Sequence, residues 1–259
     1  THTVEFAFGG LGVNSHWGTP RNPWDADRHR VPGGSSSGAG VSLCEGTALV
    51  ALGSDTAGSV RIPASMTGNV GLKTSYGRWP VSGIFPLSPT LDTAGILTKS
   101  VADAVTAFSA IDPHQRSYGP RLAREVARCS PGDFVIGTGE SALWDDCEPG
   151  ICETVEDALK TLGQAGIKTV SAPLPEAVPA IELLGVGSVV AAEIDEMLSS
   201  TAPQWRDTLD PIVSSRIRDG GSISASEYLH RHRRLRELSR SAAQRFTECQ
   251  VMISPTVAI

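Results

Sequence analysis

The spacing of apolar and polar positions predicts most of the regular elements in the first part of the chain. A continuous apolar run that ends in turn residues predicts a buried strand at 47–55. A second, shorter strand is predicted at 68–74. The small residues of 37–46 are typical of a helix that packs closely on its neighbours. Ser100 followed by apolar residues at helical spacing predicts a capped helix over 100–111.

The second part of the chain predicts a crossover unit. Strand-like segments at 133–139 and 167–175 flank an amphipathic helix at 153–166, and this order predicts a parallel strand pair. Residues 176–200 are helical by pattern. A long basic helix follows over 224–246. Its predicted core-facing side consists of Leu229, Leu235, Leu238 and Phe246.

Composition narrows the class of protein. The 259 residues are 40% hydrophobic, which is enough for a sizeable core in one large α/β domain or two ordinary ones. The formal net charge of −6 disfavours direct nucleic-acid binding. No apolar run is long enough for a membrane span, and no secretory signal pattern is present. The odd number of cysteines, five, predicts reduced thiols in a cytoplasmic protein.

Two glycine turns carry the candidate chemistry. The first reads GGSSSGAG at 33–40 and the second GSDTAGSVRIPAS at 53–65. The segment GSSSG matches a nucleophile elbow, but the polar residues before it do not form the strand that such an elbow requires. A phosphate-binding loop is disfavoured because its lysine is absent. Structural tight turns remain an alternative for either segment alone.

Taken together, these segments resemble the amidase signature family. The resemblance rests on GGSSSGAG, ALGSDTAGSVRIPAS, GLKTSYGR and LDTAGILTKSVADA, and it is dense over residues 1–105. It implies an α/β fold with a mixed, largely parallel β-sheet core covered by helices on both faces, in an incomplete form. It also implies an amidohydrolase that cleaves a C–N amide bond of a small substrate with a Ser–Ser–Lys triad, and no metal or organic cofactor.

The resemblance assigns the reacting groups to the two turns. Ser59 matches the nucleophile that forms the acyl-enzyme, and Ser35, 24 residues earlier, matches the middle member of the triad. A serine hydroxyl needs a base within hydrogen-bond reach, and Ser35 would relay the proton. The family pattern places a cis peptide bond at Gly34–Ser35. The hydroxyl oxygens of Ser35 and Ser59 are expected at hydrogen-bond distance.

Neighbouring residues are expected to support the reaction. Oxyanion and substrate binding is expected from Thr56, Ala57 and Gly58, with the Ser59 backbone N–H as a further donor. Supporting roles fall on Ser36, Asp55 and Arg61. Ser36 and Asp55 match positions that brace the turns. Arg61 either supports the site or forms a structural ion pair beneath the turn. Asp92 and Lys73 match structural positions.

The sequence departs from the family pattern at the base. The family's lysine lies upstream of the first serine, whereas the first lysine here is Lys73. We therefore expect residues 1–259 to form a single domain truncated at both ends, and the chain alone to be inactive. The alternatives are the glutaminase (A) subunit of a tRNA-dependent amidotransferase complex and a non-catalytic homologue that lacks the lysine. The expected partners are a small amide substrate and a second copy in a homodimer, without direct nucleic-acid or membrane contact.

Overall fold

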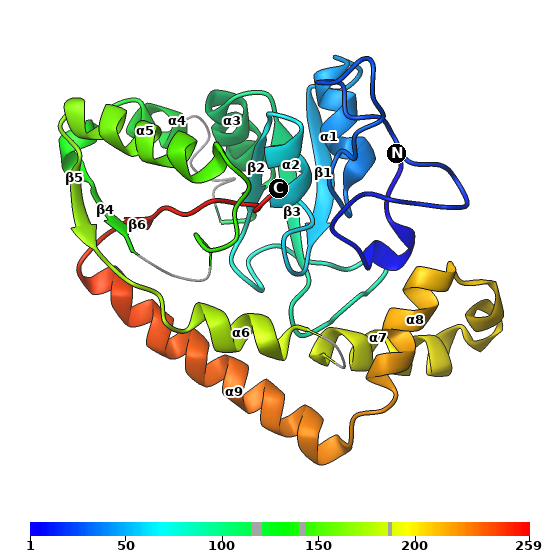
Figure 1. Ribbon diagram of the computed structural model, residues 1–259. Coiled ribbons are helices and arrows are strands. Elements are labelled where there is room, and N and C mark those ends of the chain that lie inside the picture. Colours follow the sequence, from blue (N-terminus) through cyan, green and yellow to red (C-terminus); the bar gives the residue numbers. More distant parts are fainter. Residues whose placement is uncertain (115–120, 140–142, 186–187) are drawn as a thin grey trace. The chain divides into compact units, whose positions relative to one another are not determined.

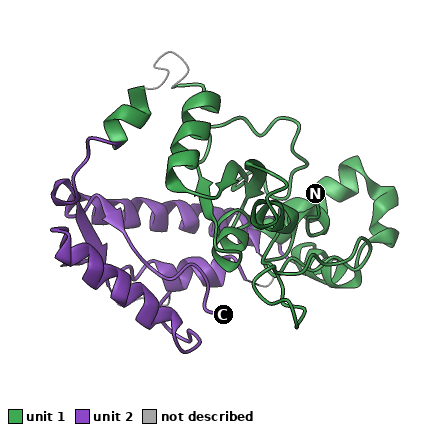
Figure 2. Cartoon of the chain, turned by 90° about the horizontal axis from the view of Figure 1, so that it is seen from above, with its two compact units in different colours: residues 1–126, 190–222 green, residues 127–189, 223–259 purple. Residues whose placement is uncertain are grey.

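The computed structural model describes residues 1–114, 121–139, 143–185 and 188–259 (Figure 1). Its internal contacts divide the chain into two compact units (Figure 2). Unit 1 comprises Thr1–Val126 and Val190–Ser222, and unit 2 comprises Ala127–Val189 and Ile223–Ile259. The α/β class with mixed strand pairing is confirmed, and the single domain over 1–259 stays a prediction.

Unit 1 is built on a three-stranded antiparallel sheet. Its order is β1 (Val50–Asp55), β3 (Thr93–Thr98) and β2 (Val70–Lys73). The β1 and β2 strands match the sequence prediction, whereas no element was predicted where β3 lies. The helices of this unit's first part are α1 (Ser37–Cys44), α2 (Arg61–Met66), α3 (Val101–Ile111) and α4 (Arg121–Val126). The predicted Ser100 cap of α3 is confirmed, because its hydroxyl accepts from the Asp103 N–H at 3.1 Å.

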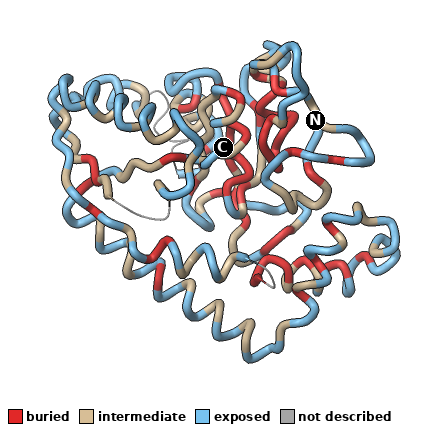
Figure 3. The backbone as a smooth tube through the Cα atoms, viewed as in Figure 1, coloured by how far each residue is buried: buried red, intermediate tan, exposed pale blue. Residues whose placement is uncertain are grey.

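The core of unit 1 lies between α1, α2 and the sheet. The backbone of these elements carries many of the residues coloured as buried in Figure 3. The cluster consists of Ala39, Leu43, Ala51, Val60, Ala64 and Leu97. Because α1 carries so many small residues, its backbone approaches its neighbours closely: a Cβ at Gly40 would lie 2.7 Å from Thr67 Oγ1. The prediction of a close-packed small-residue helix is confirmed.

The prediction that 47–55 is a fully buried strand was wrong. Ala51 is buried, but the Leu49 and Leu52 side chains are 86% and 73% exposed. The reason is that only one face of β1 packs on the core of this unit, where Ala51 lies, so its residues alternate between a packed face and an open one.

The later part of unit 1 is helical. It contains α7 (Val189–Thr201) and α8 (Pro211–Gly220), with a 3₁₀ segment at Pro203–Thr208 between them and another at Glu5–Ala7 near the N-terminus. Asp210 caps α8 by accepting from the Ile212 N–H at 2.8 Å. The two helices touch at Gly220, where only a glycine leaves room for the Ala191 backbone.

Unit 2 is built on a three-stranded parallel sheet. Its order is β5 (Lys168–Ser171), β4 (Val135–Thr138) and β6 (Val251–Met252). The crossover helix is α5 (Ile151–Gln164), so the predicted parallel pair is confirmed, with Val135 opposite Lys168. The other elements are α6 (Ala177–Leu183), α9 (Ala225–Ala243) and 3₁₀ segments at Pro131–Asp133 and Gln244–Thr247.

Two helical predictions need correction. The expected helix over 176–200 is divided into α6 and α7, because the glycine-containing segment after Leu183 ends the first helix with a turn at Leu184 and Gly185. On α9, Leu238 is buried but Leu229 is 65% exposed, and Phe246, in the 3₁₀ segment after the helix, is 53% exposed. The predicted core-facing side is therefore covered over only part of its length. No helix within the described ranges is long and apolar enough to cross a membrane.

The contact between α7 and α8 generates a stability prediction. A Cβ at Gly220 would lie 2.1 Å from the carbonyl carbon of Ala191, so the Gly220→Ala variant must push the two helices apart. We expect its free energy of unfolding to fall by about 1–3 kcal/mol in urea denaturation.

Gly163 on α5 is the matched control. A Cβ there meets nothing within 4 Å, so Gly163→Ala should raise the free energy of unfolding by about 0.5–1 kcal/mol. A Gly220→Ala variant as stable as the parent protein would contradict the close approach of the two helices.

Candidate active site

The first serine turn leads directly into α1. The Gly34–Ser35 peptide bond is cis, as the sequence predicts. Gly34 is packed against the chain at Gly9–Gly12, and its N–H donates to Gly10 O at 2.7 Å. The Ser35 carbonyl accepts from Val4 N at 3.1 Å. Ser35 is therefore held in a buried turn by backbone contacts on both sides.

The second serine turn joins the end of β1 to the start of α2. Residues 56–59 have no regular structure, and Gly58 has a φ of +128°, a conformation that side chains rarely adopt. Gly58 and Ser59 are buried, whereas Ala57 is exposed. The turn thus presents bare backbone at Ala57 beside the Ser59 hydroxyl.

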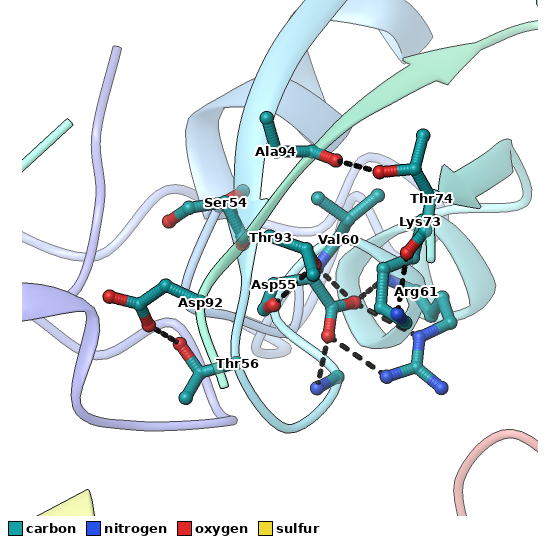
Figure 4. A network of polar contacts seen from close by, with 12 residues as sticks. Ser54, Asp55, Thr56, Val60, Arg61, Lys73, Thr74, Asp92, Thr93 and Ala94 are labelled. Carbon is teal, nitrogen blue, oxygen red and sulfur yellow. Dashed lines mark hydrogen bonds and ion pairs between the residues drawn. The ribbon is translucent and has the colours of Figure 1, made fainter. Parts of the chain in front are cut away.

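The Asp55 carboxylate holds this turn from beneath (Figure 4). Its Oδ1 accepts from Gly58 N at 2.8 Å and from Arg61 Nη2 at 2.9 Å. Its Oδ2 accepts from Val60 N at 3.1 Å and from Arg61 Nε at 3.0 Å. The carboxylate is fully buried, and Arg61 pairs with it through both ends of its guanidinium. Asp55 braces the turn as predicted, and Arg61 forms the ion pair beneath it.

Electrostatics keep Asp55 ionised. Burial alone would raise the pKa of Asp55, but the hydrogen bonds and charge of Arg61, with the Val60 and Gly58 N–H groups, hold that pKa below its ordinary value. The same pairing raises the pKa of Arg61. The turn is therefore built around a permanent negative charge at neutral pH.

Backbone contacts bring the two serine turns together, but their hydroxyls do not bond. Ser36 N donates to Ser59 O at 3.1 Å, and Ser36 Oγ reaches Ser54 O at 3.5 Å. No hydrogen bond joins the Ser35 and Ser59 hydroxyls anywhere in the described contacts, so the expected hydroxyl contact is not formed here. The turns are positioned by their backbones, and each serine rotamer is set separately.

The backbone N–H groups of the second turn differ in their hydrogen-bond partners. The Gly58 N–H donates to Asp55 and points into the protein. Among the described residues, the Ala57 and Ser59 N–H groups have no hydrogen-bond acceptor. The open pair is therefore Ala57 and Ser59, and Gly58 serves the turn's own structure in this geometry.

Thr56 has a partner that the sequence did not reveal. Its hydroxyl donates to Asp92 Oδ1 at 2.5 Å, and Asp92 Oδ2 accepts from Leu87 N and Ser88 N at 2.9 Å each. Burial raises the pKa of Asp92, and the three hydrogen bonds only partly offset it. The LDT motif indicated a structural aspartate, but no periodicity could pair it with Thr56, 36 residues earlier.

Lysines do not complete the serine pair in the described parts of the chain. No lysine there hydrogen-bonds to Ser35 or Ser59. Lys73 lies at the end of β2, and its Nζ donates to Thr74 O at 2.6 Å (Figure 4). Burial, and secondarily the charge of Arg61, lower its pKa. The structure thus keeps Lys73 in the structural role that the sequence predicts.

A cavity of about 350 Å³ lies beside the first turn. Ser35 and Ser36 form one part of its wall, and Phe6 and Phe85 contribute aromatic surface to it. The two rings pack with their centroids 5.1 Å apart. No cluster of potential metal ligands occurs within the described residues, and all five cysteines are free thiols.

The ion pair beneath the turn yields a test of stability against pH. Arg61→Met would leave Asp55 buried with backbone donors alone. Because nearly half of the Arg61 side chain is exposed, we expect a loss of only about 2 kcal/mol at pH 7. Since the folded-state pKa of Asp55 is lowered, this contribution is fully present above its unfolded value of 3.8 and is lost as pH falls through the folded pKa. Urea denaturation from pH 7 to pH 3 measures it.

Arg28→Met is the matched control, because Arg28 is 75% exposed beside Asp25 and should change little. A difference between the parent protein and Arg61→Met that grew as the pH fell would contradict the assignment.

Comparison with known proteins agrees with this geometry. The Amidase family model matches residues 1–259. The chain is 49% identical to 2-amino-5-chloromuconic acid deaminase of Comamonas testosteroni over 99% of its length, and 32% identical to the A subunit of glutamyl-tRNA(Gln) amidotransferase from Akkermansia muciniphila, also over 99%. The whole chain superposes, with a TM-score of 0.86 and 28% identity, on a protein from a vestigial complex linked to the origins of an s-triazine catabolic enzyme.

The chain spans 54% and 60% of the two relatives and 56% of the solved chain. The matches cover both serine turns and the strands and helices that hold them. The chain therefore belongs to the amidase (amidase signature) family.

Proposed function

We propose that the protein hydrolyses a C–N bond of a small amide through an acyl-enzyme on Ser59. The observation that carries this proposal is the second turn itself. It places a serine next to two backbone N–H donors that have no acceptor among the described residues, in a turn fixed by Asp55. The first serine turn is bonded to it through Ser36 N and Ser59 O at 3.1 Å. Family membership supports the same chemistry.

The mechanism assigns one task to each group. The Ser59 oxygen attacks the substrate carbonyl while its proton passes through the Ser35 hydroxyl to a base, after a change of side-chain rotamer brings the two hydroxyls into hydrogen-bond contact. The N–H groups of Ala57 and Ser59 bind the oxyanion. Each such donor contributes about 3–4 kcal/mol to the transition state. Collapse of the tetrahedral intermediate breaks the C–N bond, and the returning proton leaves with the amine. Water then hydrolyses the Ser59 ester. We do not assign the role of the base to any of residues 1–259.

The substrate class we propose follows the relative with 49% identity. That relative is named for deamination of 2-amino-5-chloromuconic acid. We therefore propose a small carboxylic acid that also carries a primary amide, whose C–N bond is cleaved with release of ammonia. Ammonia release from a panel of small primary amides with and without a carboxylate group, measured with the intact protein, tests this class.

A second candidate is the glutaminase component of a transamidating complex. Relatives named as the A subunit of glutamyl-tRNA(Gln) amidotransferase match at 31–37% identity. Such a component would use the same Ser59 but would release ammonia from L-glutamine and copurify with partner subunits. We favour a cytoplasmic, homodimeric enzyme that acts on a small substrate over this second candidate. Sedimentation of the intact protein tests the dimer.

The central prediction concerns Ser59. Because Ser59 forms the ester in the proposed mechanism, Ser59→Ala in the intact protein should lower kcat on 4-nitroacetanilide, or on a better amide from the panel, by at least about 10³-fold. Ser35→Ala should be severe but less complete, since the oxyanion donors survive. Circular dichroism should show an unchanged fold for both.

Ser37→Ala is the matched control. Its hydroxyl donates to His2 O at 3.1 Å, away from the other turn, so full activity is expected. A Ser59→Ala variant that kept a tenth of the parent turnover would eliminate Ser59 as the nucleophile.

A further inference from the structure

A chain of hydrogen bonds connects α7 to the loop that precedes β3. Glu193 on α7 accepts from Ser88 Oγ at 2.5 Å, from Thr90 N at 3.2 Å and from the Thr90 hydroxyl. This one carboxylate thereby fixes the loop at two residues. The loop is consequently a rigid support for the residue that follows it, Asp92.

Asp92 divides its two oxygens between two tasks. Oδ2 accepts from the Leu87 and Ser88 N–H groups and so closes the loop on itself. Oδ1 accepts from the Thr56 hydroxyl at 2.5 Å, a charge-assisted bond across to the other turn (Figure 4). The side chain is 94% removed from solvent, since its relative exposure is 6%. Water therefore does not compete strongly for these oxygens.

The Thr56 contact acts on a donor of the proposed oxyanion site. The Ala57 N–H belongs to the planar peptide group that begins at the Thr56 carbonyl, so its direction follows the backbone angles of Thr56. Threonine is branched at Cβ, and its χ1 angle is stiff and coupled to the backbone. Fixing the Thr56 hydroxyl therefore restricts the direction of the Ala57 N–H.

Asp55 does not perform this task. Its carboxylate binds Gly58, Val60 and Arg61, at the far end of the turn. The near end is held by Asp92 through Thr56. The turn is thus anchored at both ends by different carboxylates, Asp55 at the end of β1 and Asp92 directly before β3.

We propose that Asp92 is a positioning residue that aims the Ala57 N–H at the oxyanion through the Thr56 hydroxyl, with Glu193 holding its loop in place. This inference rests on the proposed function of Ser59. According to this proposal, Asp92 increases the rate of the reaction in addition to closing its own loop. The part of Thr56 that acts is its hydroxyl.

The test uses the intact protein with 4-nitroacetanilide, or the best amide of the panel, as probe. Thr56→Val removes the hydroxyl and keeps the shape, and we expect kcat to fall about 10–100-fold with KM within about 2-fold, because one misdirected donor costs less than the 10²–10³ of a lost one. Thr56→Ser restores the hydroxyl and should return kcat to within about 3-fold of the parent value.

Asp92→Asn gives the second, independent variant. An amide cannot accept from Thr56 and from both loop N–H groups with the strength of a carboxylate, so kcat should fall about 3–30-fold. In a double-mutant cycle, Asp92→Asn should lower kcat no further once Thr56→Val is present, because the two act as one unit.

Thr98→Val is the matched control for loss of a buried threonine hydroxyl. Its hydroxyl donates to Ser100 O at 2.9 Å at the opposite end of β3, so stability should fall while kcat stays at the parent value. Thermal midpoints of all variants separate folding from rate.

The outcomes are decisive in either direction. The positioning role would be overturned if Thr56→Val kept the kcat of the parent protein and lowered only the thermal midpoint. It would also be overturned if the effects of Thr56→Val and Asp92→Asn on kcat were additive. If Thr56→Val does not fold, parent kcat in Asp92→Asn overturns it equally. Activity retained in Ser59→Ala would instead refute the proposed function itself, so the two failures are distinguishable.

Discussion

The site depends on one buried carboxylate. Residues 56–59 lie between β1 and α2 and belong to neither element. The Gly58 carbonyl accepts from Ile62 N at 2.7 Å and the Ser59 carbonyl from Ser36 N at 3.1 Å, and the remaining shape of the turn comes from a side chain. Asp55 supplies it by accepting from Gly58 N, Val60 N and the Arg61 guanidinium. An uncompensated charge at this depth would cost several kcal/mol, and the Arg61 pair offsets that cost. Thr93 extends the arrangement to β3 by donating to Asp55 O at 2.7 Å.

Local sequence patterns predicted the parts of the site that are local. Glycine turns, small residues and a serine spacing of 24 identified both turns, and the cis bond at Gly34–Ser35 followed from the family resemblance. The crossover from β4 through α5 to β5 was predicted because its period changes clearly from 2 to 3.6. In these segments, the local preference and the tertiary structure agree.

Long-range packing determined what the sequence could not show. The exposed face of β1 depends on which face of the sheet the helices cover, and the sequence around Leu52 is the same for a strand covered on both faces as for one covered on a single face. The sequence left two interpretations of Arg61, support of the site or a structural ion pair, and its 2.9 Å distance to Asp55 identifies the ion pair. The bond from Thr56 to Asp92 joins the residue after β1 to the residue before β3, and no spacing rule reaches across 36 residues. Serine rotamers likewise follow from neighbours, so the expected hydroxyl contact could not be derived.

The burial of α1 has a consequence for how the site opens and closes. Six of its eight residues are buried, including Gly38 and Gly40, so α1 has no solvent-facing side and would not be stable as an isolated helix. It can form only when its neighbours are already in place, and it must melt when they leave. The amide hydrogens of Gly38 and Gly40 should therefore exchange with solvent only in whole-unit openings. The serine turn that precedes α1 shares that cooperative unit, which protects the chemistry from partial fraying.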